Sequence, residues 1–281
     1  MHDLNAIALC CVDTRTPLLA LKAMQRCMRE LRFGDAILFS YPEADLVRRA
    51  ALSGVRIVDP GEMNSIEAYS RFMLQGMTPY LDRDFMLVVQ WDGFVLHPDC
   101  WSDEFLDYDY IGAIWPEDFC KYTVGNGGFS LRSRKLLQAL SSPDIRVTHP
   151  EDLSICDVNR ALLEQTYDIR FAPVEIAARF AYELVESDVA TFGFHGVFNL
   201  IDAFTPEELL DLIKSMRDDM ALPAGMRTLA KRLIRDGQYE SAQRILMSRI
   251  RQGDRRWRIV SLLLRLVVRR LLGLPADRLK E

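Results

Sequence analysis

One strongly apolar segment of the sequence ends in an amide, an indole and a carboxylate. Residues 85–89 have the pattern of a buried strand, and Gln90, Trp91 and Asp92 follow directly, with Gly93 allowing a turn. Open α/β sheets bind ligands at the carboxyl ends of their strands. Gln90 and Asp92 are two residues apart, so their side chains project to the same side. The pattern predicts a ligand site at Asp92, although an aspartate before glycine is also common in plain turns.

A glycine-rich loop follows 33 residues after Asp92. It reads Gly125, Asn126, Gly127, Gly128 and leads into a strand. Glycine lets a ligand approach the bare backbone, which suits a donor or substrate loop, but a tight loop also needs glycine for its own geometry. Together with Asp92, this loop suggests a site for a phosphorylated ligand and a metal.

Two further groups carry useful chemistry. Glu151 and Asp152 begin a predicted helix, where the helix dipole favours acidic residues and keeps them ionised. An ionised carboxylate there is a candidate general base, or simply an acidic first helical turn. His195 lies between glycines and is a candidate nitrogen ligand, which would favour Mn²⁺ over Mg²⁺, or a packed histidine.

These groups suit the transfer of a sugar from a nucleotide-sugar donor. The leaving group is a nucleoside diphosphate, and a hard divalent cation with oxygen ligands can hold its developing charge. Such an ion needs only one or two protein carboxylates, because phosphates and water fill its other positions. Asp92 fits this role, and Gln90 can offer an amide oxygen or bind the ribose. An inverting transferase also needs a base for the acceptor hydroxyl, for which Asp152 or Glu151 is the candidate.

The elements that must position these groups alternate along the first 90 residues. Strands are predicted at 6–12, 36–39, 55–58 and 85–89, with helices from Pro17 to Leu31, at 45–53 and at 65–77. This alternation is typical of a doubly wound, mostly parallel sheet flanked by helices. The end of the first strand should therefore lie near the Gln90–Asp92 segment, which makes its following residues candidates for donor binding: Asp13, Thr14 and Arg15.

The rest of the chain is less regular and then helical. We expect helices at 133–140 and 151–163 and a short strand at 169–173. Thr205 and Pro206 form a helix start, and residues 230–253 resemble one helix pair of a tetratricopeptide repeat, or an ordinary helical hairpin. We predict a domain at 1–204 and a basic helical extension at 205–281.

Charge and composition limit the partners. The net charge of −5 combines 15 Lys and Arg against 5 Asp and Glu in residues 226–281, a net of +10, with −15 in the remainder. Residues 255–272 are apolar with recurring arginines, so they either lie on an anionic membrane surface or pack on the chain's own acidic domain. Nucleic acid is not an expected partner, because polar and aromatic residues suited to bases are lacking.

The same composition suggests a location. We expect no signal segment, no run of the roughly 18 apolar residues that span a membrane, and six reduced cysteines. These expectations place the protein in the cytoplasm, or peripherally on the cytoplasmic face of a membrane.

In their order along the chain these motifs resemble a family of bacterial and viral glycosyltransferase-like proteins, and more generally the GT-A class. The resemblance covers about residues 5–200. It rests on Gln90-x-Asp92, Tyr108-Asp109-Tyr110-Ile111-Gly112-Ala113-x-Trp115, Gly125-Asn126-Gly127-Gly128-Phe129-Ser130-Leu131-Arg132 and Pro150-Glu151-Asp152.

The resemblance implies a GT-A fold, Rossmann-like with a mostly parallel mixed sheet, while the residues after Thr205 themselves predict the helical extension. It implies that Asp92 binds Mn²⁺ or Mg²⁺, that His195 completes the metal shell and that Asp152 or Glu151 is the base. The loop at residues 125–128 would contact the donor sugar or the acceptor. Apart from the resemblance, we expect the acceptor to be a glycan or a lipid-linked molecule.

Two positions depart from the pattern of the family. Gln90 replaces the first acid of the metal-binding Asp-x-Asp motif, and Ile114 stands where relatives have proline. Because Gln90 replaces an acid, one alternative is a catalytically silent protein of the same fold that binds a nucleotide-sugar or a carbohydrate. A helical interaction module that acts through the basic tail is a further alternative. A nucleotidyltransferase is disfavoured, because residues 13–17 lack a phosphate loop rich in glycine and lysine.

Overall fold

The first strand is buried on both of its faces. In the computed structural model, which describes residues 2–272, every residue from Ile7 to Val12 is buried. Strands covered on both sides carry continuous apolar runs, as parallel sheets with helices on each face require. This explains why the segment reads as uninterrupted hydrophobic sequence.

A six-stranded mixed sheet surrounds this strand. Its order is β3-β2-β1-β4-β6-β5, in which β1, β2, β3 and β4 are mutually parallel and β6 runs antiparallel to β4 and β5. The strands are β1 (His2–Val12), β2 (Leu31–Phe39), β3 (Arg56–Val58), β4 (Phe85–Val88), β5 (Tyr110–Ile111) and β6 (Ser130–Ser133). The predicted fold class, a mostly parallel mixed sheet flanked by helices with a helical C-terminal part, is confirmed.

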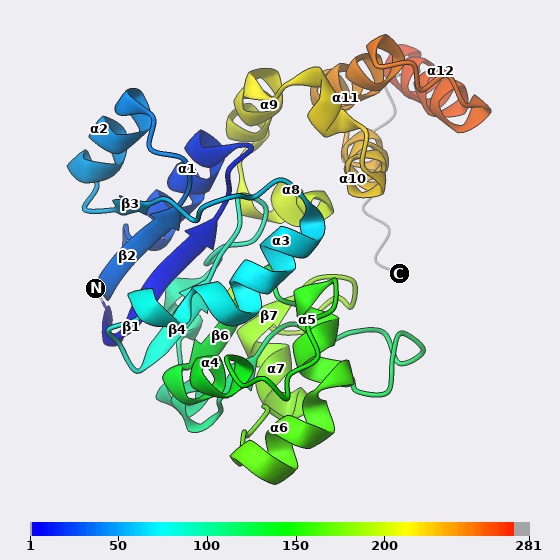
Figure 1. Cartoon of the computed structure of the whole chain (residues 1–281). Helices are drawn as coiled ribbons and strands as arrows, with labels where there is room; N and C mark the ends of the chain where they lie inside the picture. The colour runs from blue at the N-terminus through cyan, green and yellow to red at the C-terminus, as the bar shows by residue number, and fades with distance from the viewer. Residues whose placement is uncertain (1, 273–281) are drawn as a thin grey trace. The chain divides into compact units, whose positions relative to one another are not determined.

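Helices cover the sheet, as the blue, cyan and green parts of Figure 1 show. They are α1 (Pro17–Cys27), α2 (Ala44–Leu52), α3 (Ile66–Arg71), α4 (Arg134–Leu140), α5 (Glu151–Leu153), α6 (Arg160–Tyr167) and α7 (Val174–Phe180). Shorter helical turns are η1 (Phe72–Gly76), η2 (Thr78–Tyr80), η3 (Pro98–Cys100), η4 (Asp103–Asp107) and η5 (Ser154–Val158). A small parallel sheet pairs β7 (Ala181–Tyr182) with β8 (Gly193–Phe194).

The main core forms on one face of the sheet. Alternate residues of β1, among them Ala8 and Cys10, pack with η1, α4 and η5 in one apolar cluster. The intervening residues point to the other face, because successive side chains of a strand alternate. There α1 contacts both β1 and β2.

Four predicted elements differ from the structure. The helix predicted from Pro17 to Leu31 is shorter, because α1 ends at Cys27 and Leu31 already begins β2. The helix predicted at 65–77 is α3 followed by the π-helix η1, and the helix predicted at 151–163 is split into α5, the π-helix η5 and α6. Asn159 interrupts the helix between η5 and α6, because its side-chain amide nitrogen donates hydrogen bonds to the backbone oxygens of Arg146 and Ser154. The strand predicted at 169–173 is only an isolated bridge between Phe171 and Tyr110.

The chain divides into two compact units, Met1–His195 and Gly196–Glu281. The division falls before Thr205, where the sequence suggested a boundary, because η6 (Val197–Asn199) and α8 (Leu200–Ala203) contact α10. The second unit continues with α9 (Pro206–Ser215), η7 (Asp218–Ala221), α10 (Ala224–Arg235), α11 (Tyr239–Arg251) and α12 (Trp257–Leu271). Among residues 2–272, no helix has the length and apolar character needed to cross a membrane.

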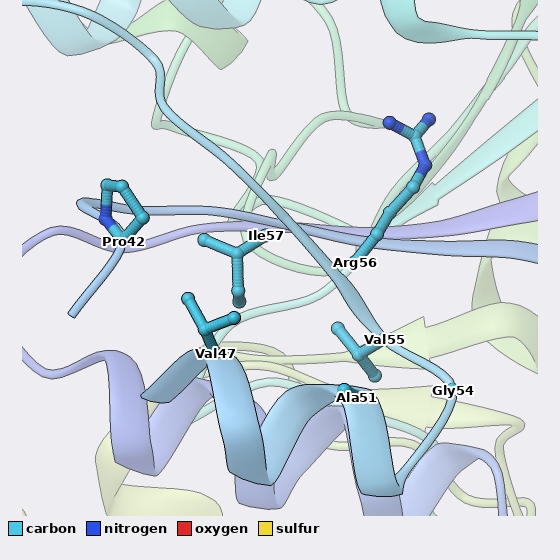
Figure 2. A pocket seen from close by; sticks show the side chains of 7 residues that line it. All are labelled: Pro42, Val47, Ala51, Gly54, Val55, Arg56 and Ile57. Atoms are coloured by element: carbon cyan, nitrogen blue, oxygen red, sulfur yellow. The ribbon is translucent and has the colours of Figure 1, made fainter. Parts of the chain in front are cut away.

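An apolar surface hollow lies at the edge of the sheet, beside β3 and α2 (Figure 2). It is lined by Pro42, Val47, Ala51, Gly54, Val55, Arg56 and Ile57. None of these residues belongs to the candidate site predicted from the sequence, and apart from Arg56 they bear no charge. The hollow therefore lacks the carboxylates that the predicted chemistry requires.

Candidate active site

A tight turn after β4 holds Asp92. The backbone nitrogen of Gln90 donates to the oxygen of Gly93 at 2.7 Å, and the nitrogen of Gly93 donates back to Gln90 at 3.1 Å. This closed turn places Trp91 and Asp92 at its tip. Burial raises the pKa of Asp92, and the neighbouring His195 opposes the rise. A carboxylate kept partly out of water, with a cation partner, is typical of functional sites.

The end of β1 lies beside this turn, as the alternation of elements predicted. β1 and β4 are parallel neighbours, and Val89 donates to the oxygen of Cys10 at 2.8 Å. Asp13 has a local task there: its carboxylate accepts from the nitrogens of Arg15 and Thr16 at 2.8 and 2.6 Å and from the Thr16 hydroxyl at 2.6 Å. It thus shapes the loop before α1, with Thr14 half-buried and Arg15 exposed.

His195 faces the Asp92 turn through one ring nitrogen. Its Nε2 lies 3.2 Å from Oε1 of Gln90 and 3.9 Å from Oδ1 of Asp92. Gln90 is held in turn, since its Nε2 donates to the Tyr69 hydroxyl at 3.1 Å. One ring nitrogen of His195 therefore meets two side-chain oxygens from a turn about a hundred positions earlier in the chain.

The other ring nitrogen of His195 is held by a half-buried acid that the sequence did not reveal. Nδ1 lies 3.0 Å from Oε1 of Glu183, and Oε2 of Glu183 accepts from Nδ2 of Asn126 at 2.7 Å. Asn126 is buried and adopts a left-handed φ of 58°, a conformation that asparagine tolerates better than most residues. The predicted loop residue Asn126 therefore positions Glu183 and His195.

This arrangement has the form of the carboxylate–histidine pair that supports metal ligands in other proteins. A carboxylate on Nδ1 fixes the ring and its tautomer, so that Nε2 can act as a ligand. The amide oxygen of Gln90, a carboxylate oxygen of Asp92 and Nε2 of His195 are a donor set that fits Mn²⁺. Within residues 2–272, no cluster of three or more His, Cys, Asp or Glu side chains could hold a metal. A metal here would therefore need donor phosphates or water for its remaining positions.

The charge on His195 makes the stability of the folded protein depend on pH. Burial alone lowers its pKa, but the hydrogen bond with Glu183 and the charge of Asp92 outweigh burial and raise the pKa to about 9. A histidine with a raised pKa stabilises the folded state fully below its unfolded pKa, near 6.5, and loses this contribution as the pH rises through about 9.

We therefore expect the metal-free protein to lose about 3 kcal/mol of stability between pH 6 and pH 9.5 from this residue. The measurement is chemical denaturation of wild type and His195→Gln in the presence of a chelator across this range. His97→Gln removes an exposed histidine and serves as the control. Equal pH profiles for wild type and His195→Gln would contradict the assigned charge.

Two glycines make room for the site side chains. A β-carbon at Gly128 would lie 2.2 Å from Nε2 of His195, and one at Gly127 would lie 2.3 Å from Oε1 of Glu151. Gly93 is similarly close to the His195 ring, at 2.7 Å. Glycine is therefore required at these two loop positions, because side chains approach the loop backbone from two directions.

We expect Gly128→Ala to displace the His195 ring and to reduce Mn²⁺ affinity at least roughly tenfold. Isothermal titration with Mn²⁺ measures this directly. Gly54→Ala is a matched control: Gly54 has a φ of +72° but no atom within 4 Å of its virtual β-carbon. This control should lose about 1 kcal/mol of stability and keep its metal affinity.

The two candidate bases have different environments. Glu151 is buried, and its Oε1 lies 3.5 Å from Nη2 of the fully buried Arg132. Burial raises the pKa of Glu151, and Arg132 opposes the rise. Asp152 is half-buried, and its Oδ2 accepts from the nitrogen of Gly127 at 3.2 Å. Asp152 is therefore the more accessible carboxylate beside the glycine loop, whereas Glu151 pairs with Arg132.

Residues that the sequence analysis missed complete the site. Tyr69, Arg132 and Glu183 hold Gln90, Glu151 and His195 respectively. Arg132 stands inside the glycine-loop motif, and an arginine in the strand directly after the loop was a usable signal for a buried partner. Nothing in the sequence around Tyr69 or Glu183 marks either residue.

The chain matches one protein family over residues 53–195, just over half of its length. The family is described as "Protein of unknown function (DUF5672)". The chain belongs to this family. The matched segment of DUF5672 runs from before β3 to His195 and contains Tyr69, Gln90, Asp92, Asn126, Glu151, Asp152 and Glu183. No curated protein matches this DUF5672 chain.

Several solved structures resemble this DUF5672 chain at low sequence identity. A glycosyltransferase involved in glycosylation of the major capsid of PBCV-1 is 11% identical, with a TM-score of 0.41, covering 67% of this chain and 91% of that one. Glucosyl-3-phosphoglycerate synthase from Mycobacterium tuberculosis, in complex with Mn²⁺, UDP and glucosyl-3-phosphoglycerate, is 14% identical, with a TM-score of 0.33 and coverage of 46% and 57%. A cytidylyltransferase from Leptospira borgpetersenii is 14% identical, with a TM-score of 0.36 and coverage of 76% and 94%.

Proposed function

We propose that this protein is a glycosyltransferase that moves a sugar from a nucleotide-sugar donor to a hydroxyl of an acceptor. The observation that carries the proposal is the convergence of Gln90, Asp92 and His195 at the carboxyl end of β4, with Asp152 beside the adjoining glycine loop. A group of side chains that could hold a metal, next to an accessible carboxylate, suits such a transfer.

A metal ion held by Gln90, Asp92 and His195 would act on the leaving group. Bound Mn²⁺ or Mg²⁺ would neutralise the charge that develops on the nucleoside diphosphate. Asp92 supplies the anionic ligand, Gln90 the neutral oxygen and His195 the nitrogen, while Glu183 and Asn126 keep the imidazole in place. The half-buried setting of Asp92 and His195 limits competition from water and strengthens each charge interaction.

Asp152 would act on the acceptor. Its carboxylate accepts one backbone hydrogen bond from Gly127, which holds it in place and leaves lone pairs for an acceptor hydroxyl. Taking the proton from that hydroxyl as it attacks the sugar from the side opposite the leaving group gives inversion. The backbone of residues 125–128, with Trp91 across the turn, would contact the donor sugar or the acceptor.

The remaining parts of the proposal concern the acceptor and location. We infer a glycan or a lipid-linked molecule as acceptor and the cytoplasm as the location, with the cytoplasmic face of a membrane for a lipid-linked acceptor. The six cysteines are all free, which supports a reducing compartment.

The test is a screen for nucleoside diphosphate released from a panel of nucleotide-sugars, with and without Mn²⁺. Turnover or slow donor hydrolysis that Mn²⁺ stimulates is the expected result. Thermal stabilisation by a nucleotide-sugar without any turnover would favour a silent binding protein of the same fold, for which Gln90 in place of an acid is the specific reason. Neither stabilisation nor turnover with any donor would overturn the proposal.

A further inference from the structure

Helix α12 has two apolar faces, of which only one is used inside its own unit. Ile259, Leu262 and Leu266 are buried, and α12 contacts α10 and α11. At 100° per residue these side chains share one side of the helix. These buried side chains hold the helix in its unit, but they do not explain why the opposite side of the helix is also apolar.

The opposite side is apolar and exposed. It carries Trp257, Val260, Leu264, Val267, Val268 and Leu271, whose exposed fractions run from 46% to 80%. On a helical projection these six positions fall within an arc of about 100°. An exposed stripe of large apolar residues along four helical turns is unusual on a monomeric protein and marks an interaction surface.

Arginines flank this stripe on both sides. Arg258 and Arg265 lie on one border and Arg270 on the other, and all three are exposed. Residues 255–272 contain six arginines and no acidic residue. An apolar stripe bordered by long cationic side chains matches the boundary between acyl chains and anionic headgroups, because the arginines reach outward while the stripe enters the hydrocarbon.

A second copy of the chain fits this surface less well. Pairing two such stripes face to face would bring one arginine border against the other, and no carboxylate in residues 255–272 would neutralise them. An anionic bilayer supplies apolar depth and negative charge together. A hollow lined in part by Leu263, Val267 and Leu271 adjoins the stripe and extends its apolar area.

We propose that the exposed face of α12 binds the surface of an anionic lipid bilayer. The helix lies parallel to the membrane plane, with Trp257, Leu264 and Leu271 inserted and the arginines at the headgroups. This proposal stands on the second unit alone and does not depend on glycosyl transfer by the first.

The test is sedimentation of the full chain with vesicles of phosphatidylcholine alone or with about one third phosphatidylglycerol. We expect at least roughly tenfold stronger binding to the anionic vesicles, weakened by added salt. Leu264→Glu should abolish binding, and the double variant Arg258→Gln/Arg265→Gln should weaken it about tenfold or more.

Controls separate surface effects from folding and from self-association. Leu52→Glu places the same charge on an apolar residue of α2 that is 81% exposed, and Arg48→Gln removes an exposed arginine there. Both should bind vesicles like wild type, and circular dichroism with thermal unfolding should show all variants folded. Equal binding to neutral and anionic vesicles, no binding to either, or a dimer in light scattering that Leu264→Glu dissociates would overturn the proposal.

Discussion

Replacing Asp152 with asparagine should lower kcat by about 10²- to 10⁴-fold, the range typical of losing a general base. The side-chain amide can still accept the hydrogen bond from Gly127, so the loop and the fold should be preserved. It cannot take a proton from an acceptor hydroxyl. Affinity for Mn²⁺ and for the donor should remain, because neither depends on proton transfer. Steady-state kinetics with the donor identified by the screen, together with donor titration, measure both effects.

Two variants make the assignment of the base specific. Asp144→Asn removes an exposed carboxylate in the preceding loop and should leave kcat unchanged. Glu151→Gln leaves the buried Arg132 without its anion, so it should cost about 3–5 kcal/mol of folding stability while the folded fraction keeps its activity. If Glu151→Gln loses turnover at full stability and Asp152→Asn retains it, Glu151 is the base instead.

Replacing Asp92 with asparagine should lower turnover at least about 100-fold and remove measurable Mn²⁺ binding. With Gln90 in place of an acid, Asp92 is the one anionic oxygen among the three converging groups, so its loss leaves only neutral donors. Isothermal titration with Mn²⁺ and nucleoside diphosphate release report the two losses separately. Asp99→Asn removes a carboxylate that is 95% exposed and should change neither quantity.

Stability should move in the opposite direction to activity in this variant. Because burial raises the pKa of Asp92 above its unfolded value, the ionised form is disfavoured in the folded protein and costs stability at neutral pH. Asp92→Asn should therefore unfold at a temperature equal to or above that of wild type, as expected for a residue kept for function. A clear loss of stability with full Mn²⁺ binding would instead make Asp92 a structural turn residue.

The variant Gln90→Asp tests how far the missing carboxylate weakens metal binding. It would restore a second carboxylate on the same side of the strand end, facing the His195 nitrogen that now lies 3.2 Å from Oε1 of Gln90. The expected result is tighter Mn²⁺ binding, together with loss of the hydrogen bond to the Tyr69 hydroxyl. Unchanged affinity would show that Gln90 serves Tyr69 and the ring of His195 rather than a cation.

The architecture was predictable because local burial leaves a period in the sequence. Strands β1 and β4 are apolar on both faces, and the helices between them follow a 3.6-residue spacing, so the alternation and the neighbouring strand ends follow from pattern alone. The predictions were wrong where short-range hydrogen bonds override the period, as Asn159 does between η5 and α6. The antiparallel pairing of β6 with β4 depends on the path of a long connection, which has no period to detect.

The sequence by itself determined the parallel strands β1 to β4, the turn that carries Gln90 and Asp92, and the order of the motifs around it. Only the tertiary structure decided which side chains meet. It joined Glu183 to His195, used Asn126 to hold that pair, and separated a buried Glu151 from an accessible Asp152. The physical reason is that burial is read locally along the chain, whereas a hydrogen bond between residues 57 or 105 positions apart depends on how distant loops fold back on each other.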